Sequence, residues 1–81
     1  MHCTWQVTIV RLNGKPDLNY TEVRGRTPTP SDILERHSSE GETVRGRVGS
    51  WHHVPPPKGL GNSLGIYEIR AGEIAGSPRR P

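Results

Sequence analysis

An alternation of residue types near the start of the chain constrains its fold most strongly. In residues 3–12, CTWQVTIVRL, four apolar side chains alternate with polar ones: Cys3, Trp5, Val7 and Ile9. A period of two in β-branched and aromatic residues is typical of a strand with one buried face. The segment therefore predicts a half-buried β-strand.

A turn signal follows this segment directly. Asn13 and Gly14 both tolerate a positive φ, so the pair favours a tight hairpin turn. Residues 18–24 then read as the return strand. Val23 interrupts the alternation of that strand, which predicts a bulge or an early strand end at this position.

The segment after the proline-rich connector at residues 27–30 is open to two interpretations. The pattern at Thr29 to Asp32 resembles a helix N-cap with a proline at the first helical position, and it favours a short helix over residues 30–38. The only apolar residues there are Ile33 and Leu34, which give a helix too narrow an apolar stripe for tertiary packing. A short strand from Asp32 to His37 is the alternative.

Two further strands are expected in the second half of the chain. Residues 42–54 read as a long strand, and Gly46 and Gly49 inside it indicate a bend or a close backbone approach. Three consecutive prolines at 55–57 end it, because proline has no N–H for the sheet. A loop over residues 58–63 leads to the last strand, residues 64–70.

These elements predict one small all-β domain over residues 1–75, because 81 residues leave no room for a second domain. We expect four to five short strands in an SH3-like, partly open barrel. The alternative is an α+β, ββαββ arrangement, a β-grasp-like sheet with one short helix at 30–38. Residues 76–81 contain almost nothing apolar and are expected to form a disordered basic tail.

The sequence lacks the motifs that are typical of several classes of function. Cys3 is the only cysteine and the histidines are not spaced as metal ligands, so we expect neither a disulfide nor a metal site. The glycine-rich loop at residues 58–65 matches neither phosphate-binding template. No nucleophile turn is present. We therefore expect no catalytic residue, no cofactor and no enzyme activity.

The compartment is expected to be the cytoplasm. The N-terminal residues lack the basic and apolar regions of a signal peptide. No apolar stretch approaches the roughly 18 residues of a membrane helix, so we expect no membrane partner.

Arginine supplies the main functional signal. The net charge is +3 and nine of the 11 cationic side chains are Arg, which suits bidentate contacts with phosphate. Strand alternation places Arg45, Arg47 and Trp51 on one face, and cations beside an aromatic ring are typical of single-stranded nucleic-acid binding. The opposing interpretation buries Trp51 and leaves the arginines solvated. The predicted binding residues are Arg24, Arg26, Arg45, Arg47, Trp51 and His53.

A second function class also fits the sequence. A small open sheet leaves unpaired backbone groups at its edges, and a strand of a partner protein can bind to them. The chain could thus be a protein-interaction or assembly module, and a homo-oligomer is compatible with this interpretation. Weak binding of a nucleic acid or another polyanion is the interpretation that we favour.

Overall fold

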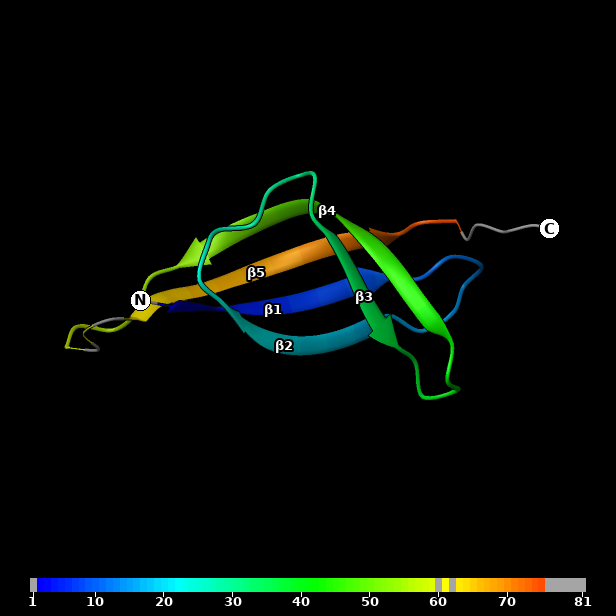
Figure 1. Ribbon diagram of the computed structural model, residues 1–81, viewed down its shortest axis with the longest axis horizontal. Coiled ribbons are helices and arrows are strands. Elements are labelled where there is room, and N and C mark those ends of the chain that lie inside the picture. The colour runs from blue at the N-terminus through cyan, green and yellow to red at the C-terminus, as the bar shows by residue number, and fades with distance from the viewer. Residues whose placement is uncertain (1, 60, 62, 76–81) are drawn as a thin grey trace.

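The computed structural model describes residues 2–59, 61 and 63–75, and within these the chain is all-β, with no helix (Figure 1). Five strands form one sheet in the order β2-β1-β5-β4-β3. Their bounds are β1 (His2–Val10), β2 (Leu18–Arg24), β3 (Ile33–His37), β4 (Thr43–Val54) and β5 (Ser63–Glu73). The predicted all-β class and number of strands are confirmed. The predicted basic tail, residues 76–81, lies outside the described residues.

The first hairpin forms where the sequence predicts it. Asn13 has a φ of 58° and Gly14 a φ of 70°, the positive values that such a turn requires. The bulge or early end predicted at Val23 is wrong, because β2 stays in continuous register with β1 through Arg24. The Val23 side chain lies on the solvent side and is 66% exposed.

The segment after the connector is a strand, and the helix over residues 30–38 is wrong. All five residues of β3 pair with β4, so the edge of β4 supplies their backbone partners. Only Leu34 of this strand is buried, so the strand contributes a single side chain to the core. The Asp32 carboxylate accepts hydrogen bonds from Thr29 and Arg26 in a turn instead of capping a helix.

The centre of the sheet is a parallel pair, β1 with β5. Trp5 lies opposite Tyr67, Val7 opposite Ile69 and Ile9 opposite Ala71. A parallel pair needs a long crossover connection, and here β2, β3 and β4 together make it. β5 runs three residues past its predicted end at Arg70, so it pairs with β1 over nearly the full length of that strand.

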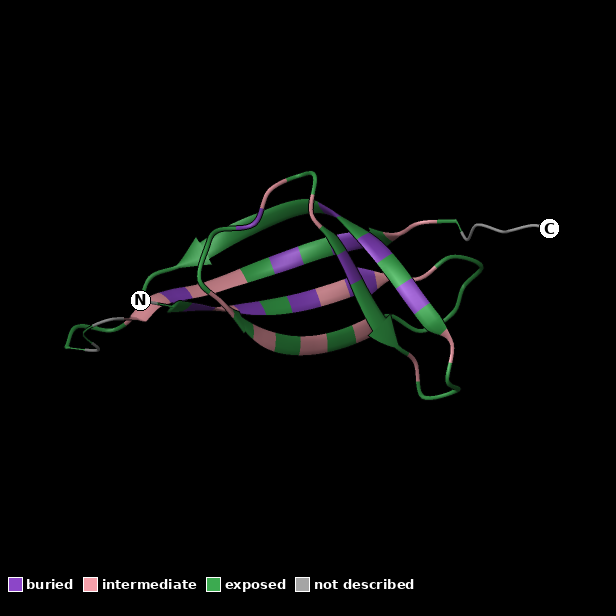
Figure 2. Ribbon diagram, in the orientation of Figure 1, coloured by how far each residue is buried: buried purple, intermediate pink, exposed green. Residues whose placement is uncertain are grey.

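β4 bends sharply, so that its first half and β3 lie across the other strands and the sheet curls into a half-barrel (Figure 1). The core fills this curl, and buried positions alternate with more exposed ones along β1 and along the first half of β4, whereas the second half of β4 is exposed (Figure 2). Gly46 permits the close approach that its position predicts, since a Cβ there would lie 3.0 Å from Ile9 Cγ2. The fold is that of a small SH3-like, partly open barrel. Its buried residues are Cys3, Trp5, Val7, Ile9, Leu34, Val44, Val48, Ile69 and Ala71.

Candidate functional site

A register shift in β4 decides which side chains reach the outer face, the side of the sheet opposite the core. Val48 lies opposite Ala71 and Ser50 lies opposite Arg70, so Gly49 is an extra residue between two consecutive pairs. An extra residue reverses the face on which every later side chain lies. The outer face therefore continues from Arg47 to Ser50 and not to Trp51.

The prediction that Trp51 shares a face with Arg45 and Arg47 is thus wrong. Trp51 lies opposite Ile69, on the core side of the sheet, with 37% of its surface exposed. His53 is also on the core side, where its ring stacks on Tyr67 with the centroids 4.6 Å apart. Its Nε2 lies 2.5 Å from the carbonyl oxygen of Leu64. Neither ring stands beside the outer arginines.

Three exposed arginines gather on the outer face of β4 and β5, and we call Arg45, Arg47 and Arg70 the arginine ridge. Arg47 on β4 lies opposite Gly72 on β5, and Gly72 is two residues after Arg70. Arg47 and Arg70 are therefore diagonal neighbours on adjacent strands. Arg45 Nε lies 3.5 Å from Glu35 Oε2, an exposed pair that water screens strongly. Within the described ranges, neither Arg47 nor Arg70 has an ion-pair partner. Arg70 was not among the residues that the sequence pattern predicts for binding.

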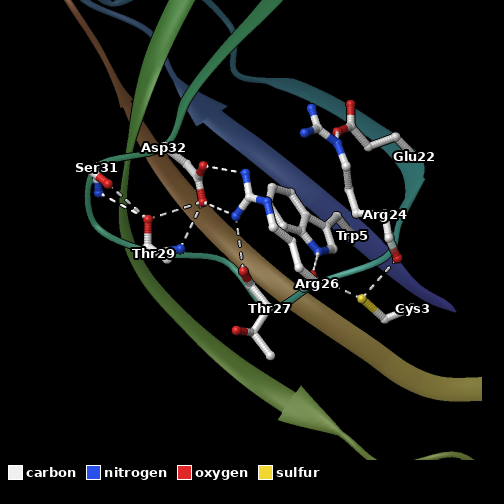
Figure 3. Close-up of polar contacts among 9 residues, drawn as sticks. All are labelled: Cys3, Trp5, Glu22, Arg24, Arg26, Thr27, Thr29, Ser31 and Asp32. Atoms are coloured by element: carbon white, nitrogen blue, oxygen red, sulfur yellow. Dashed lines mark hydrogen bonds and ion pairs between the residues drawn. The ribbon is translucent and has the colours of Figure 1, made fainter. Parts of the chain in front are cut away.

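Arg24 and Arg26, the other predicted arginines, lie on the core side and cover Trp5 (Figure 3). The guanidinium carbons lie 4.9 Å (Arg24) and 5.3 Å (Arg26) from the centre of the Trp5 ring. Each also forms an ion pair, Arg24 with Glu22 and Arg26 with Asp32. Arg24 and Arg26 thus interact with other side chains of the fold, and they lie away from the ridge.

The chain that joins β2 to β3, residues 25–32, forms a strap over Trp5. Trp5 Nε1 donates a hydrogen bond of 3.0 Å to the carbonyl oxygen of Arg26. Asp32 Oδ2 accepts hydrogen bonds from Arg26 Nη1 at 2.9 Å and from the Thr29 N–H at 2.8 Å. The hydrogen bond from Arg26, with help from Thr29, lowers the pKa of Asp32 to about 2.

We expect Asp32→Asn to weaken the fold at neutral pH but not in strong acid. A carboxylate with a lowered pKa stabilises the fold above its ordinary pKa near 4, and that contribution is lost as the pH falls toward 2. The expected loss at pH 7 is about 1 kcal/mol, because Arg26 is half exposed and screened by water. Urea unfolding at pH 7, 4 and 2.5 measures it. A constant difference between the two proteins over this range would contradict the assignment.

Beside the ridge, the outer face is hollowed into a trough of about 810 Å³ that crosses β2, β1, β5 and β4. Two rows of polar side chains line it, one residue from each strand in each row. The first row is Thr21, Gln6, Glu68 and His52, and the second is Asn19, Thr8, Arg70 and Ser50. Arg70 thus belongs both to the trough and to the ridge.

The side chains that face the trough are hydrogen-bonding groups. Between the two rows run Tyr20, Val7, Ile69 and Trp51, whose side chains lie on the core side. His52 Nε2 lies 2.5 Å from Glu68 Oε1, and Thr8 Oγ1 donates to Asn19 Oδ1 at 2.8 Å. The described part of the chain contains no group of three or more His, Cys, Asp or Glu side chains placed to hold a metal ion. It also contains no helix with the length and apolar character to cross a membrane.

In comparisons with known proteins, no family model matches the chain, and no curated protein or solved structure is detectably similar to it. The ridge and the trough are therefore the features of this chain that indicate a function.

Proposed function

We propose that this protein is a non-enzymatic module that binds single-stranded nucleic acid through its phosphates, on the arginine ridge. The observation that carries the proposal is the juxtaposition of three exposed arginines, two of them without an ion-pair partner in the described segments. Guanidinium groups bind phosphate oxygens in a bidentate manner. The net charge of +3 favours the same class of ligand.

Charge, and not stacking, is the expected basis of affinity at this ridge. The Gly49 register shift takes the Trp51 ring to the core side, so no tryptophan stands beside Arg47 to stack on a base. Binding by phosphate contacts alone is weak and falls steeply with salt, since each contact releases counterions. Three contacts on a single strand give a slope of about −2 in a plot of log affinity against log salt.

The test is a fluorescence-anisotropy titration of a labelled mixed-sequence oligonucleotide at low and moderate salt. We expect Arg47→Ala to weaken binding and to reduce the salt slope by about 0.7, the share of one phosphate contact. Arg24→Gln is the matched control, because it removes the same charge from the core side of the sheet. Tryptophan fluorescence should change little in the complex.

Two results would contradict this function. The first is the absence of binding at low salt. The second is an affinity that responds equally to Arg47→Ala and Arg24→Gln, because the charge of the whole molecule would then matter and the ridge would not. Strong quenching of tryptophan fluorescence would place the bases on the core side instead.

The edge of β2 supports a second candidate function, an assembly module that accepts a partner strand. Among the described strands β2 pairs only with β1, and its seven residues contain neither proline nor lysine to block the free edge. The exposed Val23 adds apolar surface there. Sedimentation equilibrium tests pairing with a second copy: Val23→Lys should reduce self-association, and Val54→Lys, at the far side of the sheet, should not.

A further inference from the structure

We infer that the trough binds the bases of the strand whose phosphates lie on the arginine ridge, and that it prefers cytosine to thymine. This inference rests on the proposed function and adds base recognition to it. The trough adjoins the ridge through Arg70, which belongs to both. A strand held by its phosphates on the ridge can therefore place its bases in the trough. The volume of about 810 Å³ is within the range of pockets that hold small organic ligands.

The charge distribution orients the strand. Glu68 lies in the first row of the trough, the row farther from the ridge, opposite Gln6 on β1 and His52 on β4. Its carboxylate repels a phosphate, whereas Arg70 in the second row and Arg47 beyond that row attract one. The sugar–phosphate backbone is therefore held at the ridge, and uncharged bases are the part of the ligand that the first row accepts.

The side chains in the trough suit the edges of unpaired bases. Glu68 is an acceptor for an amino group, and a carboxylate pairs with cytosine N4. Gln6 lies beside it in the neighbouring strand and offers both a donor and an acceptor. Thymine presents a carbonyl oxygen where cytosine presents its amino group, so it would set an acceptor against the Glu68 carboxylate. This difference predicts the preference for cytosine.

The contacts inside the trough leave one acceptor of Glu68 and one donor of Asn19 available to a ligand. His52 Nε2 occupies Glu68 Oε1, so Glu68 Oε2, which has no hydrogen-bond partner among the described residues, is the oxygen that accepts from a base. Thr8 Oγ1 donates to Asn19 Oδ1, which turns the Asn19 amide nitrogen into the free donor of that side chain. The strands fix the spacing of the row, so the polar groups are in place before a ligand binds. Only a single strand exposes the Watson–Crick edges that this row contacts, which favours unpaired nucleic acid over a duplex.

The experiment compares oligo-dC and oligo-dT of equal length, at low salt and neutral pH. We expect the wild-type protein to bind oligo-dC at least about fivefold more tightly. Glu68→Gln should bring the two affinities close together without weakening the binding of oligo-dT. Glu35→Gln is the matched control: it removes the same charge beside Arg45, outside the trough, and should strengthen both affinities while leaving their ratio unchanged.

The two proposals fail in different ways. Equal binding of both oligonucleotides, with a normal response to Arg47→Ala, would overturn base recognition and leave the ridge in place. A ratio that survives Glu68→Gln in a folded variant would also overturn it. If neither oligonucleotide binds, the proposed function is overturned and base recognition with it. Should the Glu68→Gln variant not fold, amide shifts in the wild-type protein with dCMP and dTMP decide the question. Shifts at Gln6, Thr21 and Glu68 that are larger with dCMP support the inference, and equal or absent shifts overturn it.

Discussion

Trp5→Ala is expected to cost the fold about 3–5 kcal/mol, the largest loss from a single side chain in this protein. Trp5 is fully buried in the centre of the sheet and is the largest residue of the core. Its replacement also removes the ring beneath Arg24 and Arg26 and the hydrogen bond from Nε1 to the strap. The strap then loses the group that holds it.

A loss of this size approaches the whole stability of a domain of this length, about 4–12 kcal/mol. Urea unfolding followed by circular dichroism measures it, and the variant should be partly unfolded at physiological temperature. Trp51→Ala is the matched control, because that ring is 37% exposed and its removal should cost about 1 kcal/mol. Equal losses for the two tryptophans would contradict the placement of Trp5 at the centre of the core.

The strands themselves could be predicted because their signals are local. The alternation of Trp5, Val7 and Ile9 and the Asn13-Gly14 turn depend on neighbouring residues only, and both match the structure. Residues 33–37 form a strand and not a helix because the edge of β4 provides their backbone partners. The alternation of residue types within a segment carries no information about a partner strand that is distant in the sequence.

The candidate site depends on two features that no local pattern reveals. One is the pairing of β4 with β5, which brings Arg70 next to Arg47. The other is the register shift at Gly49, which moves Trp51 to the core side and puts Ser50 and His52 in the trough. The position of Gly49 inside the strand predicts a bend, and the local sequence is the same whether a glycine bends a strand or adds a residue to it.

The same bulge explains how one strand serves both the core and the site. Before Gly49, the buried residues Val44, Gly46 and Val48 alternate with outward arginines. After it, Ser50 and His52 take the outward positions and the strand turns its polar side chains into the trough. A regular strand would have put Trp51 there and kept Ser50 inside. The outer face is therefore polar from the ridge to the far end of the trough.

Gly65→Ala is expected to destabilise the protein by about 3–4 kcal/mol, through backbone strain and a steric overlap together. Gly65 has a φ of 99°, and a Cβ there would overlap the carbonyl oxygen of Val54 and lie 2.9 Å from His53 Nε2. Gly59→Ala separates the two costs, because Gly59 has a similar φ of 92° but open space around its Cα. The Gly59→Ala variant should lose about 1–2 kcal/mol of stability, and this loss measures the backbone strain alone. The remainder measures how tightly the end of β4 packs on the start of β5, and equal losses in thermal unfolding of the two variants would show that this contact is loose.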